Sequence, residues 1–238
     1  GSDDGAINEL KKVIRINPKR PLEFQNTFNA YLYRLTGDLS KVLVGRRFDN
    51  IAWATQKYFE ELVCQWVKNA VSVTGIRNVV AGGGAFLNVK ANKKIKELRV
   101  VDKFFVYPAC DDGGTPVGAA LEAYVKYCQD KKIEAKLHPL QDLYYGSDHS
   151  DDIIEQKIKK SKWKKNANLL SGKIEKIIAK LISQGKIIAR FSGRDEWGPR
   201  ALGNRSILAD PRNLAIVQKL NFAVKQRDFW MPFAASIL

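Results

Sequence analysis

The chain has 238 residues, of which 45% are hydrophobic and 10% aromatic, and its 40 Lys and Arg against 25 Asp and Glu give a formal net charge of +15. This length and composition are typical of one large or two small globular domains and exclude a disordered chain. The positive charge favours an anionic partner such as a nucleotide, a phosphate or a nucleic acid, although a solvated lysine-rich surface explains most of the excess.

The cysteines, Cys64, Cys110 and Cys128, are widely spaced and form no CxxC pair. Neither a zinc module nor a disulfide framework is therefore predicted, and we expect a reducing compartment, the cytoplasm. We recognise no signal peptide pattern and no apolar run long enough to span a bilayer, so we expect no membrane partner.

The first part of the chain is predicted to be helical. We expect short helices over residues 7–16 and 24–35, and a long one within residues 46–74, where apolar residues recur at helical spacing. Asp49 is the expected N-cap of the long helix, and Gly75 is expected to end it.

Two units of strand, glycine-rich turn and helix follow. The first has a strand from Asn78, the turn Gly82-Gly83-Gly84 and a helix over residues 91–98. The second has a strand over residues 103–107, a turn around Gly113 and Gly114, and an Ala-rich helix over residues 116–127 that we expect to pack tightly. This order predicts an α/β layer with its loops gathered at one end of a sheet.

Glycine turns before helices let backbone N–H groups approach a phosphate. Neither a P-loop nor a Rossmann pattern is present, so a tight turn without a ligand is equally compatible. Asp111 and Asp112, in the second turn, could bind a metal or a ribose, or could cap the following helix.

An irregular stretch over residues 129–146 predicts a domain boundary, which gives domains at 1–134 and 135–238. Beyond it we expect helices over residues 148–164, 174–183 and 214–224 and a buried strand over 186–191.

The stretch after that strand, residues 194–206, contains three arginines, two carboxylates, an amide and a hydroxyl. Gly198, Pro199 and Gly203 exclude a long helix through it. Guanidinium groups at the end of a strand are suited to phosphate or carboxylate oxygens, although a surface salt-bridge loop is also compatible.

Three blocks of the chain, residues 81–88, 112–120 and 193–212, carry a family resemblance. In this order they resemble the ATP-dependent O-carbamoyltransferases of the nodulation and antibiotic-tailoring type. The third block, with its core Gly-Pro-Arg-Ala-Leu-Gly-Asn-Arg-Ser-Ile-Leu-Ala-Asp-Pro-Arg, is long and very specific.

The resemblance implies two α/β domains. Residues 1–134 would form the second lobe of an actin/sugar-kinase-like domain, as in threonylcarbamoyl transferases, and residues 135–238 the first part of a domain similar to threonylcarbamoyl-adenylate synthases. The implied reaction joins ATP with carbamate from carbamoyl phosphate, and the resulting carbamoyl adenylate then carbamoylates a hydroxyl of a sugar or another small molecule.

The resemblance also implies site residues. The adenylate-forming site would consist of Arg194, Glu196, Arg200, Asn204, Arg205, Ser206, Lys225 and Arg227. Its cations would hold both anionic substrates and stabilise charge on the pyrophosphate, and Glu196 would hold an arginine or help bind Mg²⁺. In the first domain, nucleotide phosphates would contact Gly82, Gly83, Gly84, Asn88, Gly113 and Gly114.

Asp112 matches the family's ligand for Fe²⁺ or a similar divalent metal, with Asp111 as the alternative. The family's HxxxH pair is missing, because the histidines are His138 and His149. We therefore expect the first lobe to lie elsewhere in a longer chain or on a partner subunit, and a homodimer is also compatible.

A non-catalytic nucleotide- or RNA-binding module is the alternative function, supported by the charge and by the likeness to tRNA-modifying folds. We do not expect nucleic acid, since the aromatic residues do not alternate with basic ones as in RNA-binding sheets. RNA binding would weaken steeply with salt, whereas dependence on carbamoyl phosphate would mark the enzyme.

Overall fold

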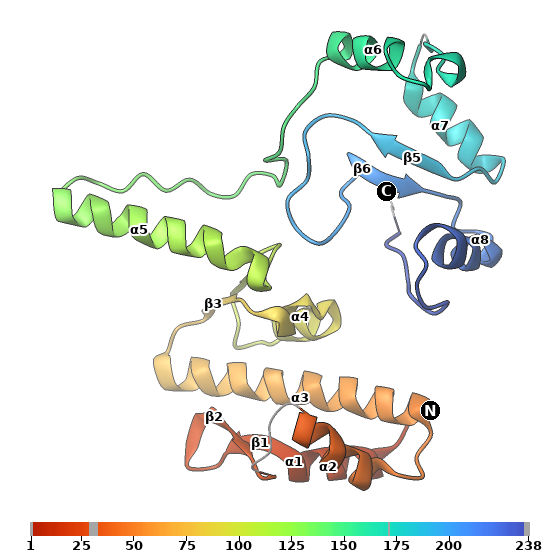
Figure 1. The fold of residues 1–238 in the computed structure, drawn as a ribbon. Coiled ribbons are helices and arrows are strands. Elements are labelled where there is room, and N and C mark those ends of the chain that lie inside the picture. The colour runs from red at the N-terminus through yellow and green to blue at the C-terminus, as the bar shows by residue number, and fades with distance from the viewer. Residues whose placement is uncertain (1, 29–32, 171, 236–238) are drawn as a thin grey trace. The chain divides into compact units, whose positions relative to one another are not determined.

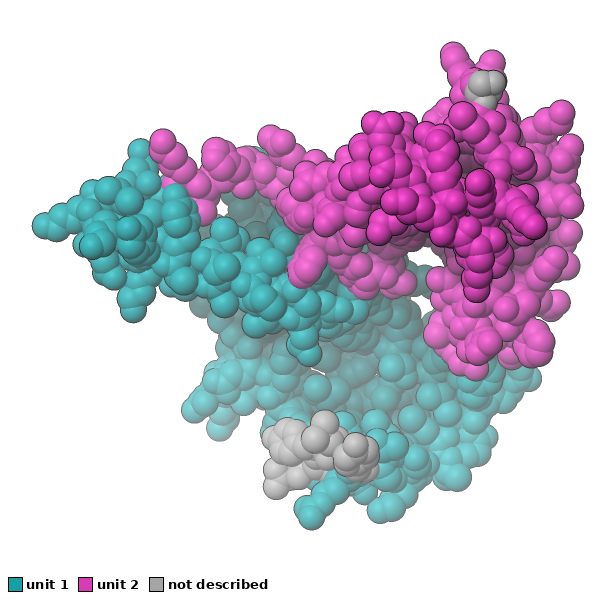
Figure 2. Space-filling view, turned by 45° about the horizontal axis from the view of Figure 1, so that its top comes forward, with its two compact units in different colours: residues 1–135 teal, residues 136–238 magenta. Residues whose placement is uncertain are grey.

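The computed structural model describes residues 2–28, 33–170 and 172–235. The chain divides into two compact units, Gly1–Ala135 and Lys136–Leu238 (Figures 1 and 2). Both combine helices with short two-stranded sheets, so the fold is α/β as predicted. Among the described residues, no helix has both the length and the apolar character needed to cross a membrane.

The elements run in the following order. Unit 1 contains α1 (Asp4–Val13), β1 (Ile14–Asn17), β2 (Arg20–Asn26), α2 (Tyr33–Leu43), α3 (Phe48–Thr74), β3 (Asn78–Ala81), α4 (Val89–Lys96), β4 (Lys103–Val106) and α5 (Thr115–Lys131). Unit 2 contains α6 (Asp151–Lys159), α7 (Ile174–Ser183), β5 (Ile188–Phe191), β6 (Arg205–Leu208) and α8 (Leu214–Lys219).

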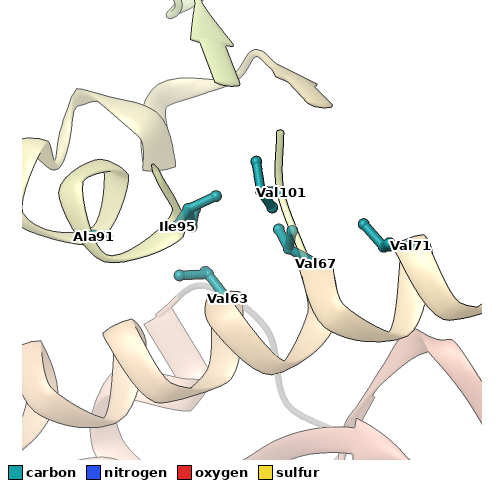
Figure 3. Close-up of a cluster of buried hydrophobic side chains, with 6 residues drawn as sticks. All are labelled: Val63, Val67, Val71, Ala91, Ile95 and Val101. Carbon is teal, nitrogen blue, oxygen red and sulfur yellow. The ribbon is translucent and has the colours of Figure 1, made fainter. Parts of the chain in front are cut away.

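Helix α3 carries the core of unit 1 on two sides. One side packs against α4 through a cluster of buried side chains, drawn in Figure 3: Val63, Val67, Val71, Ala91, Ile95 and Val101. The other side contacts α1 through Ala54 and Tyr58. Gly75 ends α3 with a φ of 70°, as predicted, but Arg47, not Asp49, is the N-cap.

The two predicted helices before α3 are only partly correct. The first ends at Val13, where β1 begins, and β1 pairs with β2 in an antiparallel hairpin. The predicted helix over residues 24–35 is wrong at its start, because Phe24 lies in β2; residues 29–32 are outside the described residues. Phe24 packs against Trp66 of α3 with ring centroids 5.3 Å apart, a tertiary contact that outweighs local propensity.

Strands β3 and β4 pair in parallel, from Asn78 opposite Lys103 to Ala81 opposite Val106. Their carboxyl ends therefore lie at one edge of the sheet. The two glycine turns meet there, since the Gly83 amide donates to the Cys110 carbonyl at 2.5 Å. The predicted gathering of these loops is confirmed.

Helix α5 does not pack as tightly as its small residues predicted. Among its side chains only Cys128 is buried, while Leu121 and Tyr124 are 49% and 39% exposed. Its helical form comes from intrahelical hydrogen bonds and from Pro116 in the first turn, where a missing N–H costs nothing.

Among the described residues, unit 2 has fewer buried hydrophobic side chains than unit 1. Ile216 and Leu220 are its buried hydrophobic residues in the described part. Strand β5 is not the buried strand predicted, because it alternates and leaves Phe191 62% exposed. It forms an antiparallel pair with β6, which begins at Arg205, inside the stretch predicted as a loop. Helix α6 is shorter than predicted. Helix α8 continues as a π-helical turn, Leu220–Val224, and the two together cover the predicted helical range 214–224.

Candidate active site

The connection from β5 to β6 is residues 192–204, and the arginine loop, residues 194–206, extends it into β6. The clamp segment, residues 143–147, runs beside the loop and exchanges backbone hydrogen bonds with it. Trp197 N–H donates to Leu143 O at 2.7 Å, and Gly146 N–H donates to Asp195 O at 3.0 Å. This pairing fixes one side of the loop to a segment about 50 residues earlier in the sequence.

Gly146 allows this close approach. A Cβ at this position would lie 2.1 Å from the Cβ and 2.9 Å from the Cα of Asp195. The Gly146 carbonyl in turn accepts a hydrogen bond from Arg194 Nε at 3.0 Å. The sequence reading missed the clamp segment, because residues 143–147 have no periodicity and their partner is distant in the chain.

Glu196 holds the loop from within. Its Oε1 accepts the Asn204 backbone N–H at 2.5 Å, and the Asn204 side chain donates to Arg194 O at 3.0 Å. Burial alone would raise the pKa of the Glu196 carboxyl, but the N–H groups of Asn204, Leu202 and Arg205 outweigh it, so the pKa is lowered. Glu196 is therefore a charged acceptor for the loop backbone.

Arg205 is an anchor at the base of the loop. Its guanidinium lies 3.4 Å from the centroid of the Phe191 ring and donates to Ser192 O at 2.8 Å and Gly193 O at 3.0 Å. It also forms an ion pair with Asp195 at 2.7 Å. Most of its donors therefore bind the protein itself, which leaves little of the guanidinium for a ligand.

The remaining polar residues of the loop divide into two groups. Ser206 is 8% exposed, and its hydroxyl accepts the Gly203 N–H at 2.9 Å, so it supports the loop. Arg200 is exposed and makes no hydrogen bond or ion pair with any residue that the structure describes. The loop therefore presents Arg200 as a free guanidinium on a backbone held by its neighbours.

Lys225 and Arg227 lie after the π-helical turn. Arg227 Nε donates to Asn221 Oδ1 at 2.7 Å, and its guanidinium lies 4.5 Å from the centroid of the Phe233 ring, whereas Lys225 is exposed. A surface cavity of ≈ 790 Å³ adjoins this turn. It is lined by Phe222, Ala223, Gln226, Arg227 and Asp228. No hydrogen bond or ion pair within the described ranges joins this turn to the arginine loop.

In unit 1, the first glycine turn presents an open backbone. Gly83 has a φ of 103°, which favours glycine, and Cβ atoms built on Gly82, Gly83 or Gly84 would meet no described atom within 4 Å. The second turn is packed, because a Cβ on Gly114 would lie 2.2 Å from the carbonyl oxygen of Ala109. Gly113 donates its N–H to Asp111.

Asn88 is held by a residue that the sequence reading missed. Its Oδ1 caps α4 by accepting the Ala91 N–H at 3.2 Å. Its amide also exchanges two hydrogen bonds with the Gln56 amide of α3, at 2.8 and 3.2 Å. Gln56 is one polar residue on a long helix and gave no local signal of this role.

The two aspartates of the second turn differ in their contacts. Asp111 Oδ1 accepts the Gly113 N–H at 3.1 Å, which is a capping role, while Asp112 is exposed. In the part of the chain that the structure describes, no three His, Cys, Asp or Glu side chains gather as metal ligands. These residues alone do not fit a divalent metal site.

Two family models match the chain. The carbamoyltransferase N-terminus matches residues 13–121 and the carbamoyltransferase C-terminus matches residues 179–238, together well over half of the chain. The chain belongs to the carbamoyltransferase family. The C-terminal match contains the arginine loop and the turn at Arg227, and the N-terminal match contains both glycine turns, which confirms the predicted resemblance.

Individual relatives support the same family assignment. An uncharacterized protein of Methanocaldococcus jannaschii, MJ1058, is 34% identical over 243 residues, which is 100% of this chain and 39% of that protein. The nodulation protein NolNO of Sinorhizobium fredii is 34% identical over 221 residues, 89% of this chain and 32% of that protein. Nodulation protein NolO of Bradyrhizobium diazoefficiens is 32% identical over 190 residues. The chain thus spans about a third of the length of these relatives.

Proposed function

We propose that this chain is part of an ATP-dependent O-carbamoyltransferase. Unit 2 contributes the site that forms carbamoyl adenylate, and unit 1 contributes the second, actin/sugar-kinase-like lobe of the domain that transfers the carbamoyl group. The observation that carries the proposal is the arginine loop: an exposed Arg200, without a polar partner among the described residues, on a backbone held by Glu196, Arg205 and the clamp segment.

The chemistry explains why such a loop suits adenylation. A carbamate oxygen attacks the α-phosphorus of ATP, a new P–O bond forms, and pyrophosphate leaves with the bridging oxygen. Both reactants are anions, so fixed cations must bring them together and stabilise the charge on the leaving group. A guanidinium held free of protein partners can grip two oxygens at once without first breaking a contact.

The second step is proposed for unit 1. There a hydroxyl of a sugar or another small molecule attacks the carbamoyl carbon, and AMP leaves. The open backbone of Gly82 to Gly84 supports close approach of the adenylate phosphate, since no described atom lies within 4 Å of the position that a Cβ on these glycines would take. Asn88, fixed by Gln56 at the start of α4, lies beside this turn.

The test is exchange of labelled pyrophosphate into ATP by the protein at its natural length. Exchange that requires carbamoyl phosphate is expected for the parent protein. In Arg200→Ala the exchange rate should decrease by about 100-fold, because one charge-stabilising donor is removed. Arg200→Lys should recover only a small part, because an ammonium cannot bind two oxygens in a fork.

Lys186→Ala is the matched control, since Lys186 is also an exposed cation of unit 2 but precedes β5. It should leave exchange unchanged. Absence of exchange in the parent protein, or an equal loss in Lys186→Ala, would overturn the proposed role of the arginine loop.

A further inference from the structure

Asn221 is the most deeply buried polar residue of unit 2 in the described part of the chain. It is 1% exposed, on the π-helical turn that follows α8. A buried side-chain amide must find partners for its donors and acceptor, because leaving them unpaired costs about 1–3 kcal/mol each. The partners that Asn221 finds therefore indicate what it is for.

All of these partners belong to the segment that follows. Asn221 Nδ2 donates to Phe229 O at 3.0 Å and to Met231 O at 2.9 Å. Its Oδ1 accepts from Arg227 Nε at 2.7 Å, and its backbone carbonyl accepts the Arg227 N–H at 3.0 Å. The Asn221 side chain thus closes residues 221–231 into a loop and holds the Arg227 guanidinium, while the Asn221 backbone holds the Arg227 backbone.

The contacts of Arg227 leave one edge of its guanidinium available. Nε is taken by Asn221, and Nη2 makes a long hydrogen bond to Pro232 O at 3.4 Å. Nη1 has no partner among the described residues, and Arg227 lines the ≈ 790 Å³ cavity. An arginine held through Nε with Nη1 free is set up to bind an anion without losing side-chain freedom on binding.

The backbone of the turn supports the same interpretation. Gln226, between Lys225 and Arg227, has a φ of 47°, a left-handed conformation that costs energy for a residue other than glycine. The Lys225 N–H closes the π-helical turn by donating to Leu220 O at 2.9 Å. Such turns persist where surrounding contacts impose them, and Asn221 supplies those contacts here.

We propose that Asn221 is a positioning residue: it holds the Arg227 guanidinium in the wall of the cavity, with Nη1 directed to an anionic ligand of the phosphate or pyrophosphate class. This inference rests on the proposed function, because it assigns Arg227 to the anion site. It goes further by making a buried amide, which touches no ligand, responsible for the affinity of that site.

The first experiment needs no ligand. In the parent chain the Nε–H of Arg227, assigned from the spectrum of Arg227→Lys, should exchange slowly with solvent by NMR. Asn221→Ala should accelerate this exchange by about tenfold or more, because local opening then exposes the group. Unchanged exchange in Asn221→Ala would overturn the positioning role.

The second experiment measures the affinity for inorganic pyrophosphate by calorimetry. Asn221→Ala and Arg227→Ala should each weaken binding by about 10- to 100-fold, the value of a hydrogen bond to a charged group. The double variant should bind no more weakly than Arg227→Ala, because Asn221 acts through Arg227. Additive losses would overturn the inference.

Asn213→Ala is the control for a purely structural asparagine. Asn213 caps α8, with its Oδ1 accepting the Ala215 N–H at 2.9 Å, and no hydrogen bond among the described residues joins it to Arg227. It should lower stability by about 1 kcal/mol and leave the pyrophosphate affinity unchanged. An equal loss of affinity in Asn213→Ala and Asn221→Ala would also overturn the inference.

If Asn221→Ala does not fold, the parent chain decides the case, because the Arg227 Nε–H should exchange slowly with solvent there. Fast exchange of this N–H in the parent chain would contradict the proposal. If the parent chain itself binds no pyrophosphate, the proposed function fails, while the Nε–H exchange still decides whether Asn221 positions Arg227.

Discussion

The glycine turns of unit 1 and the arginine loop of unit 2 are both candidate phosphate sites, and they are held in different ways. The glycine turns are short, and their main contacts are backbone hydrogen bonds and caps within a few residues, apart from the link between Gly83 and Cys110. The arginine loop is held by side chains and by a segment far away in the sequence. Its charged residues therefore include both supports of the loop and the proposed ligand-binding group.

This difference changes the meaning of a cluster of arginines. Arg205 is engaged with the protein through both Nη groups, whereas Arg200 and Lys225 are exposed and make no hydrogen bond or ion pair through their side chains in the described ranges. Residue type alone does not separate these roles, because a guanidinium suits a carbonyl oxygen as well as a phosphate. The contacts of each side chain do separate them, and substitution can test the separation.

The largest expected effect is that of Arg205→Ala. This substitution removes hydrogen bonds to Ser192 and Gly193, the ion pair with Asp195 and the stack on Phe191. We expect the free energy of unfolding to fall by about 2–3 kcal/mol, measured by urea denaturation.

Arg200→Ala is the matched variant on the same loop and should change the free energy of unfolding by no more than about 0.5 kcal/mol. The comparison between anchoring and free arginines fails if the two variants lose equal stability. It also fails if Arg205→Lys is as stable as the parent chain, because an ammonium cannot stack on Phe191 and reach both carbonyls.

The second effect tests the glycine turns, at Gly114. A Cβ on Gly114 would lie 2.2 Å from the carbonyl oxygen of Ala109, so Gly114→Ala must displace the backbone before α5. We expect a loss of about 1–3 kcal/mol, as for other overpacked sites, in the same denaturation experiment.

Gly118→Ala is its control, because a Cβ there meets nothing within 4 Å and lies in a helix. It should raise the free energy of unfolding by about 0.5–1 kcal/mol, since alanine loses less backbone entropy than glycine in a helix. Similar losses in Gly114→Ala and Gly118→Ala would mean that close packing does not set the requirement for glycine at the second turn.

The same contrast explains what the sequence could predict. Helix α3 with its end at Gly75, the strands β3 and β4, and helix α7 follow from local periodicity and turn residues, and all were predicted. The antiparallel β1–β2 hairpin was missed because Phe24 is fixed by Trp66, which is distant in the sequence. The clamp segment was missed for the same reason: Gly146 acquires its role only where Asp195 approaches it.

The residues of the candidate site show this limit at the level of single side chains. The sequence placed Glu196 and Asn204 in one loop, and the structure joins them through a hydrogen bond at 2.5 Å. The sequence could not indicate Gln56 or Asn221, because each is one amide among many polar residues and gains its role from a partner brought close by folding. Local patterns thus identify the loops, and tertiary contacts identify their supports.

A smaller effect is expected for Gln56→Ala. Asn88 then keeps its cap to Ala91 but loses both hydrogen bonds to the Gln56 amide, and Glu60 loses the bond that this amide donates to it at 2.6 Å. The free energy of unfolding should fall by about 1 kcal/mol, and the effect should largely disappear in an Asn88→Ala background, because the two amides act as a pair.

Gln65→Ala is the matched control on the same helix. Gln65 is exposed, and among the described residues its amide donates to Asn69 alone, one turn away, at 2.9 Å. Gln65→Ala should change the free energy of unfolding by no more than about 0.5 kcal/mol. Equal effects for Gln56→Ala and Gln65→Ala would show that the glycine turn does not depend on this distant support.

The smallest effect concerns a pair whose partners are two residues apart. Arg212 binds Asp210 through Nε and Nη2, and these hydrogen bonds, with that from the Arg212 backbone N–H, lower the pKa of the Asp210 carboxyl to about 2. Because the folded pKa lies below the unfolded one, the pair stabilises the fold above the unfolded pKa, and this stabilisation is lost as the pH falls through about 2. Arg212 is 75% exposed, so solvent screening keeps the stabilisation from this pair small.

NMR titration should find the low pKa of Asp210 in the parent chain and a return towards about 3.9 in Arg212→Ala. If the pKa of Asp210 stays low without Arg212, then contacts other than this local pair hold the end of β6, as they hold the arginine loop before it.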